Sequence, residues 1–434
     1  MAELSLPRTR LEQRIQAANL NVHEFTVRFG EAAESTGEKV AVSERQAKRW
    51  FAGAAALPRA GARRVLESWL CESVGVLFGP PSTDVEPGPT MTGEEMIMTA
   101  GRESVEHAIG SASAIDPSAL EQLHAEAQRA ARAYYFAPPL AMLADLVRLR
   151  NTVYEQLDRT AKPRQKAELY LIAGQVCGLL SSVSWDLGYP DVADEQARAA
   201  HTYGSVIDHP SLQAWARALQ VTVTFWSGRP RRATSIASTA LDTAPAGTAR
   251  ARLHSVNARA LALVGAHQEV AAELAAAAEE LDRAGDDPFL DEIGGELGFD
   301  RSRRALCAGA SFVALGNGEQ AEIESTAALA LFGQMPERVR WEAGELGARV
   351  DLSAARVLRG DLAGAENALQ PVLDLAPERR TEALSRRLVN LGRVLGTRQF
   401  RGAVEANRMG EAIEEFTALC PSRSVSHPAL PTSE

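Results

Sequence analysis

Apolar positions in the long C-terminal part of the chain recur every three to four residues. Between residues 167 and 187 they are Leu169, Ile172, Val176, Leu179, Leu180, Val183 and Leu187. This spacing places the side chains on one face of an α-helix. Gly174 and Gly178 lie among them and would let a neighbouring helix approach closely. No run of alternating β-branched residues occurs in the sequence, so we expect an all-α protein.

Five glycines mark an internal repeat, with steps of 40, 37, 51 and 44 residues between Gly188, Gly228, Gly265, Gly316 and Gly360. Five residues after each glycine stands a small residue, namely Ala193, Ala233, Val270, Ala321 or Ala365, and twelve residues after it stands Ala200, Ala240, Ala277, Ala328 or Val372. Glycine accepts the positive φ that ends one helix, and the small residues let the next helix pack back on it. The pattern resembles tetratricopeptide repeats and predicts an α-solenoid of helical hairpins. A non-repetitive, Ala-rich helical bundle is the alternative.

Composition divides the chain into four parts. Residues 8–79 form a compact helical pattern, and residues 80–93 are rich in Pro, Ser, Thr and Gly, which is typical of a linker. Residues 94–420 hold the repeats. The Pro- and Ser-rich tail, residues 421–434, is expected to be disordered.

Charge is distributed unevenly between these parts. The 434 residues have a net charge of -10, which argues against a protein that coats nucleic acid or a membrane along its whole length. Residues 1–79, however, contain 11 basic and 9 acidic residues, so the remainder carries -12. The acidity therefore belongs to the repeats, which we expect to stay clear of DNA, and it does not count against DNA binding by the N-terminal part.

Basic residues cluster in a stretch without acidic residues that ends before Glu67. They are Arg45, Lys48, Arg49, Arg59, Arg63 and Arg64. Ser43 is a suitable N-cap for a short helix, and Gly53 a suitable stop. Helical spacing turns Ala47 and Trp50 toward the core and Arg45, Lys48 and Arg49 outward.

Apolar stripes on both sides of this helix supply its packing partners. They consist of Val22, Phe25 and Phe29 before it and of Val65, Leu66, Trp69 and Leu70 after it. The sequence thus predicts a unit of three or four helices whose central pair resembles a helix-turn-helix. A short helix with arginine in its first turn can enter the major groove of double-stranded DNA and fork onto a guanine edge. Lys48, Arg59, Arg63 and Arg64 are expected to contact phosphates. A solvated basic face without a nucleic-acid role is the alternative.

A family resemblance covers almost the whole chain, residues 8–420. The segments that carry it include VSERQAKRWFAG, LPRAGARRVLESWLCESVGVLFGPP, LYLIAGQVCGLLSSVSWDLGYPDVADEQARAA and RVDLSAARVLRGDLAGAENALQPVL. They resemble actinobacterial (Streptomyces-type) Cro/C1-type regulators of the XRE family, which combine an N-terminal helix-turn-helix with C-terminal tetratricopeptide repeats.

The resemblance implies a recognition helix in the major groove and a homodimer on two half-sites. Glu44, Arg45 and Arg49 fall where base-reading residues stand, with Ser43 at the helix cap and Trp50 in the core. One departure is the segment after Phe29, GEAAESTGEKVAV, which is longer than the tight turn of the plainest helix-turn-helix.

In related repeat-containing regulators the superhelix binds a peptide, a small molecule or a protein on its concave face, which implies allosteric control of the DNA-binding part. The candidate lining residues are Tyr134, Tyr135, Arg148, Arg150, Trp185, Trp215, Trp226 and Trp341. Ordinary packing between hairpins is the alternative for the aromatic residues, and surface ion pairing is the alternative for the two arginines. If the repeats bind no effector, they serve mainly for dimerisation.

Enzyme, cofactor and metal sites are not predicted. The sequence has no phosphate loop, dinucleotide fingerprint, GxSxG elbow or HExxH motif, and its eight histidines lack ligand spacing. The segment GELGFDRSRR, residues 295–304, is predicted to be a loop entering a helix. Cys71, Cys177, Cys307 and Cys420 are too widely spaced for a disulfide framework or a metal site, and we expect buried or partly buried thiols. Without a signal peptide or a long apolar run, we expect a cytoplasmic, nucleoid-associated protein that does not bind membranes.

The leading hypothesis is therefore a DNA-binding transcription regulator whose repeats dimerise, sense a signal, or both. The rival hypothesis is a repeat-based protein-interaction scaffold whose helix-turn-helix domain has lost DNA binding.

Overall fold

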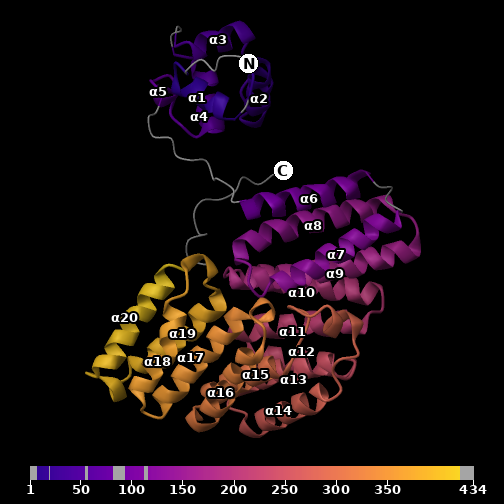
Figure 1. The fold of residues 1–434 in the computed structure, drawn as a ribbon, viewed down its shortest axis with the longest axis vertical. Helices are drawn as coiled ribbons and strands as arrows, with labels where there is room; N and C mark the ends of the chain where they lie inside the picture. The colour runs from indigo at the N-terminus through magenta and orange to yellow at the C-terminus, as the bar shows by residue number, and fades with distance from the viewer. Residues whose placement is uncertain (1–6, 19, 54–56, 82–92, 112–115, 421–434) are drawn as a thin grey trace. The chain divides into compact units, whose positions relative to one another are not determined.

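The computed structural model describes residues 7–18, 20–53, 57–81, 93–111 and 116–420. It divides into two compact units, Met1–Ala100 and Gly101–Glu434. Within the described ranges all regular secondary structure is helical (Figure 1), so the expectation of an all-α protein is confirmed. The predicted linker, residues 80–93, lies mostly outside the described residues, and the predicted tail, residues 421–434, lies wholly outside them.

Five helices make up the described part of the first unit before residue 82. They are α1 (Arg10–Ala17), α2 (Val22–Ser35), α3 (Glu44–Phe51), α4 (Ala60–Leu70) and the single turn α5 (Val74–Leu77). The sequence predicts three or four, and the difference arises from the additional short helices α1 and α5. The core is aromatic: Phe25 meets Phe51 edge to face at 5.0 Å between centroids, and Phe29 meets Trp50 at 5.9 Å. Such edge-to-face pairs add to the burial of the rings.

The connection between α2 and α3 is shorter than the sequence indicates. Residues 30–35 continue α2, so the chain leaves helical geometry only at Thr36 and enters α3 after Ser43. A capping box fixes the start of α2, since Asn21 accepts from the Glu24 amide and the Glu24 carboxylate accepts from the Asn21 amide. Gly37, with φ of 70°, makes the turn that redirects the chain toward α3.

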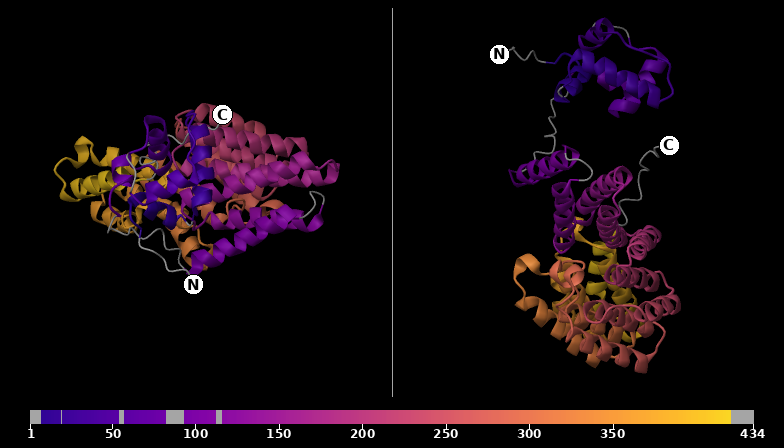
Figure 2. Two further views of the ribbon diagram at one scale, coloured as in Figure 1. Left: turned by 90° about the horizontal axis from the view of Figure 1, so that it is seen from above. Right: turned by 90° about the vertical axis from the view of Figure 1, so that its right-hand side faces the viewer.

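The second unit consists of consecutive helical hairpins. The elements that lie wholly or partly in it are α6 (Gly93–Ser111), α7 (Pro117–Ala133), α8 (Pro139–Arg159), α9 (Pro163–Asp186), α10 (Pro190–Val206), α11 (Pro210–Trp226), α12 (Pro230–Leu241), α13 (Thr248–Ala262), α14 (His267–Leu281), the π-turn η1 (Pro288–Glu292), α15 (Arg301–Ala314), α16 (Gly318–Gln334), the 3₁₀ turn η2 (Glu337–Val339), α17 (Glu342–Leu358), α18 (Leu362–Leu373), the 3₁₀ turn η3 (Pro377–Arg379), α19 (Glu382–Leu395), the 3₁₀ turn η4 (Arg398–Phe400) and α20 (Val404–Ala418). From α9 to α18, each helix packs against the next, and the odd-numbered helices α9 to α19 stack in chain order (Figures 1 and 2). This arrangement is that of a solenoid.

The five repeat glycines behave as their spacing predicts. Each follows the first helix of a hairpin and has a φ between 70° and 86°. All ten small residues that stand five and twelve positions after them are buried. A side chain at the glycine would strain the turn, and a larger residue at the small positions would separate the two helices of a hairpin.

The irregular step of 51 residues between Gly265 and Gly316 has a structural cause. An insertion of residues 282–300 separates α14 from α15 and contains η1. It packs back on α7: the Glu296 amide donates to the Ala131 carbonyl at 2.9 Å, and the Tyr135 hydroxyl donates to the Gly295 carbonyl at 2.7 Å. A Cβ on Gly295 would lie 2.2 Å from the Ala131 oxygen, so only glycine allows this approach.

Helix α9 lies at the centre of the second unit. Every residue from Ile172 to Asp186 is buried, so the stripe predicted for one face is only part of its contact surface. Gly178 allows the ring of Trp215 on α11 to lie directly against the α9 backbone, as the small residues predict. Among the described residues α9 is the one helix long and apolar enough to cross a membrane, but 78% of that window is buried, as in the core helix of a soluble protein.

The last hairpin closes back on the first ones. Helix α19 contacts α9, and η3 contacts α8. The Arg386 guanidinium donates to the Trp226 carbonyl at 2.7 Å, and Arg379 donates to the Phe136 carbonyl at 3.3 Å. Segments separated by 160 to 243 residues therefore meet. Side chains from the first helices α9, α11, α13, α15, α17 and α19 line one shared cavity.

Candidate functional site

The first candidate surface is the outer face of α3. The Ser43 hydroxyl accepts from the Gln46 amide at 3.3 Å and caps the helix. Ala47 and Trp50 are buried, whereas Arg45, Lys48 and Arg49 are exposed, in the orientation that helical spacing predicts. No ion pair joins these three cations to any carboxylate in the described part of the chain.

The other residues predicted to contact DNA differ in their exposure and in whether they have partners within the unit. Arg59 is exposed where α4 begins. Arg63 is half-buried and donates to the Pro58 carbonyl at 3.4 Å. Arg64 pairs with Glu38 at 2.6 Å, and this hydrogen bond lowers the pKa of the Glu38 carboxyl. Both Arg63 and Arg64 therefore have partners within the unit.

Glu44 has a partner outside α3. Its carboxylate lies 3.1 Å from Nδ1 of His23 on α2. A carboxylate in the first turn of a helix also interacts favourably with the helix dipole. We call Arg45, Lys48, Arg49 and Arg59 the basic surface, because these are the exposed cations of the predicted set that have no ion-pair partner among the described residues.

The second candidate is an interior cavity of about 140 Å³ in the repeat unit. The first helices of the hairpins and the insertion form its wall. Four of the eight residues predicted to line a concave site are here: Tyr134, Trp185, Trp226 and Trp341. Tyr135 lines a smaller neighbouring pocket together with Tyr134 and Trp341.

The other three predicted lining residues lie elsewhere. Trp215 is fully buried between α9 and η1, where it meets Phe289 edge to face. Arg148 pairs with Asp145, and Arg150 lies 5.7 Å over the ring of Tyr154. Core packing therefore describes Trp215 and surface ion pairing describes Arg148, whereas Arg150 contacts the Tyr154 ring and donates to the Asn151 side chain.

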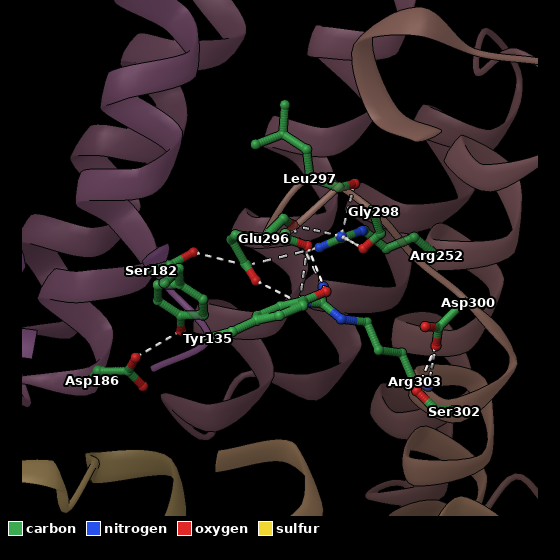
Figure 3. A network of polar contacts seen from close by, with 12 residues as sticks. Tyr135, Ser182, Asp186, Arg252, Glu296, Leu297, Gly298, Asp300, Ser302 and Arg303 are labelled. Carbon is green, nitrogen blue, oxygen red and sulfur yellow. Dashed lines mark hydrogen bonds and ion pairs between the residues drawn. The ribbon is translucent and has the colours of Figure 1, made fainter. Parts of the chain in front are cut away.

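A buried ionic network holds the insertion against the cavity wall (Figure 3). The Glu296 carboxylate accepts from Arg303 at 3.0 Å and from the Ser182 hydroxyl at 3.0 Å. Arg252 donates to the carbonyls of Glu296, Leu297 and Gly298 at 2.7, 3.1 and 2.6 Å. These contacts place each buried charge against partners within the protein, so the network serves to fix the loop.

Arg303 also joins the aromatic part of the wall. Its guanidinium lies 5.2 Å from the ring centre of Tyr135 and 4.6 Å from that of Trp341. The segment 295–304 is a loop entering α15, as predicted, and it supplies Glu296 and Arg303. No motif in the sequence assigns these two residues a role, although the long step between the glycines marks the insertion that brings them to the wall.

Asp186 stands on the cavity wall without a cationic partner in the described ranges. The Tyr134 hydroxyl donates to its Oδ2 at 2.6 Å. Burial raises the pKa of the Asp186 carboxyl to about 7, and Tyr134 opposes that rise only in part. Its other oxygen accepts no hydrogen bond within the described structure.

Arg259 and Arg387 form the basic part of the wall. Arg387 binds both oxygens of Asp351 at 2.6 Å. Arg259 lies over the rings of Phe225 and Trp226, at 4.8 and 5.2 Å, and pairs with no carboxylate that the structure describes. Burial, followed by the charge of Arg387, lowers the pKa of the Arg259 guanidinium to about 10. These residues were missed by the sequence reasoning, because nothing in their spacing shows that α13, α17 and α19 meet.

The thiols differ in exposure: Cys71 is exposed, and Cys177, Cys307 and Cys420 are buried. The expectation of buried or partly buried thiols is therefore wrong for Cys71, which stands just after the last turn of α4. No group of three or more potential metal ligands occurs within the described residues.

Comparison with known proteins gives no relative: no protein-family model matches the chain, and no curated protein matches it.

Proposed function

We propose that the protein is a DNA-binding transcription regulator. In this proposal α2 and α3 act as a helix-turn-helix, and the basic surface binds double-stranded DNA as part of a homodimer. The hairpins act as tetratricopeptide-like repeats that mediate dimerisation, sense a signal, or both. The observation that carries the proposal is the row of exposed, unpaired Arg45, Lys48 and Arg49 on a short capped helix.

The chemistry of this row suits DNA in two ways. Arg45 stands in the first turn of α3, where an arginine can reach a guanine edge and donate two hydrogen bonds. Arg49 lies one turn further, where it can likewise reach a base edge, and Lys48 and Arg59 can neutralise phosphates. Trp50 anchors the opposite face of α3 in the core and thereby fixes the orientation of the row.

Charge distribution supports the same assignment. The basic surface belongs to a unit of nearly neutral charge, while the repeats carry the excess of acidic residues. Acidic repeats are repelled by the phosphate backbone, which confines DNA contact to the small unit.

The experiment compares three full-length proteins in a pull-down of genomic DNA fragments, followed by titration of the enriched fragments. The test variant is Arg45→Ala/Arg49→Ala. The control variant is Arg231→Ala/Arg232→Ala, which removes the same charge from exposed positions at the start of α12.

We expect the wild type and the control variant to enrich the same discrete fragments. Loss of one bidentate base contact costs about 1–3 kcal/mol, so the test variant should lose roughly 10-fold or more in specific affinity and less in non-specific affinity. Absence of sequence-dependent binding by the wild type at low salt would overturn the proposal and favour the protein-interaction scaffold.

A further inference from the structure

The interior cavity presents a cation that the protein itself does not neutralise. Arg252 and Arg303, two of the four arginines on its wall, are engaged by Glu296 and by loop carbonyls. Arg387 is engaged by Asp351. Arg259 remains as a half-buried guanidinium that forms no ion pair of its own in the described structure: it shares the nearby charge of Asp351 with Arg387, and its other close neighbours are aromatic rings and the Cys307 thiol. Holding an unpaired charge away from water is costly, and an anionic ligand would compensate that charge.

The size and lining of the cavity restrict what that ligand is. A dry cavity of about 150 Å³ holds a benzene-sized molecule, and this cavity measures about 140 Å³. The cavity wall also carries apolar side chains, among them Trp185, Val223 and Val256. A wider groove of about 930 Å³ shares Arg259 and Arg387 with the cavity, so the charged end of a ligand can reach them from that side.

The charges on the wall also select the kind of anion. Arg259, Arg387 and Asp351 together leave one net positive charge, which matches a single negative charge. On the same wall Glu296 is paired with Arg303 and Arg252, which keeps those charges with one another. A monocarboxylate fits this balance, whereas a phosphate dianion leaves one charge uncompensated.

We propose that the cavity binds a small monocarboxylic acid with an aromatic or similarly compact apolar body. The carboxylate accepts hydrogen bonds from Arg259 and Arg387, and the apolar body lies against Trp185, Val223 and Val256. The free oxygen of Asp186 accepts from a hydroxyl or amino group where the acid carries one.

Such a ligand would connect two distant parts of the solenoid. Arg259 belongs to α13 and Arg387 to α19. Helix α19 is also linked to the end of α11, because Arg386 donates a hydrogen bond to the Trp226 carbonyl. A carboxylate between the two arginines would stabilise this closed arrangement of hairpins. Only the consequence for transcription rests on the proposed function, since the binding site itself is independent of DNA.

The test is calorimetric titration of the full chain, without DNA, with three probes. They are 3-phenylpropionate, its neutral amide and inorganic phosphate. We expect the acid to bind roughly 10-fold or more tightly than the amide, equivalent to about 1.4 kcal/mol, and phosphate not to bind. Quenching of tryptophan fluorescence should follow the same titration, because Trp185, Trp226 and Trp341 line the cavity.

Arg259→Met tests the assigned residue, with Arg232→Met as the control at an exposed site on α12. The first variant should lose the preference for acid over amide, and the second should keep it. Because Arg259 forms no ion pair in the described structure, Arg259→Met should retain the melting temperature of the wild type, which separates loss of binding from loss of folding.

Four results would overturn the proposal: equal affinity for acid and amide, phosphate binding as tight as that of the acid, no binding of the acid below about 10 mM, or an unchanged preference in Arg259→Met. Acid binding without any DNA binding leaves this site standing and removes the regulator proposal. DNA binding without acid binding would remove the proposed site and leave the regulator proposal standing.

Discussion

Gly178→Ala probes the closest helix contact in the repeat unit. A Cβ at this position would lie 2.1 Å from Cζ3 and 2.3 Å from Cη2 of Trp215. Ordinary carbon–carbon contact is about 3.5–4.0 Å, so the ring or the backbone of α9 has to move by more than about 1 Å. The ring has little room, since it is fully buried and meets Phe289 on η1.

Two opposing effects determine the size of the change. Alanine improves helix propensity over glycine by about 1 kcal/mol. Overpacking a dense core costs about 1–3 kcal/mol and sometimes more, and the overlap with a rigid ring places this site at the upper end. We therefore expect a net loss of about 2 kcal/mol in the free energy of unfolding of the second unit. Gly410→Ala in α20 is the control, because a Cβ there meets nothing within 4 Å and should stabilise the helix.

The assay is thermal unfolding of the full-length variants, followed by far-ultraviolet circular dichroism. Gly178→Ala should melt several degrees below the wild type, and Gly410→Ala at or above it. In the double variant Gly178→Ala/Trp215→Phe, the destabilisation should be smaller than the sum of the single effects, because the smaller ring makes room for the methyl group. A melting temperature of Gly178→Ala equal to that of the wild type, or additive effects in the double variant, would refute the reasoning.

Three further predictions concern charge and reactivity. Because burial raises the pKa of Asp186 from its usual 3.8 to about 7, the folded state binds this proton more tightly than the unfolded state, and stability falls as the pH rises from about 4 to 7. Asp186→Asn removes that dependence, so the melting temperature of the variant should rise relative to that of the wild type as the pH increases from about 4 to 7. A difference in melting temperature that does not change with pH would contradict the raised pKa of Asp186. A thiol reagent such as Ellman's reagent should modify Cys71 in the native protein and reach the three buried cysteines only after denaturation, which a count of released chromophore measures. Lys48→Ala should weaken DNA binding about equally on all sequences and lower the slope of log affinity against log salt by about one, whereas a loss restricted to one sequence would show that Lys48 reads bases.

The sequence was most informative where structure depends on neighbouring residues. The positive φ of Gly188 and the other repeat glycines is a local requirement, and so is the tight packing at the small residues that follow them. The outward orientation of Arg45, Lys48 and Arg49 follows in the same way from the cap at Ser43 and the helical period. These features depend on contacts within about one hairpin, which periodicity records directly.

The sequence was less informative about which charged residues are free. Arg45 and Arg64 belong to the same acid-free stretch, but only Arg64 pairs with Glu38, which lies 26 residues earlier. The same limit applies to the predicted lining residues: Trp185 lines the cavity, whereas Trp215 is buried elsewhere. Both are apolar residues on first helices of hairpins, and their surroundings depend on how successive hairpins are rotated.

Periodicity and caps along the chain are enough to predict its helices, the repeated hairpins of its second part, and the exposed basic row on a short helix. The return of α19 to α9 and the folding of the insertion after α14 onto α7 are visible only in the folded protein. Those two contacts form the cavity and bring Asp186, Arg259 and Arg387 to one wall. The physical reason is that local patterns specify turns and faces, while closure of the solenoid depends on the accumulated rotation of many hairpins, and no single segment encodes it.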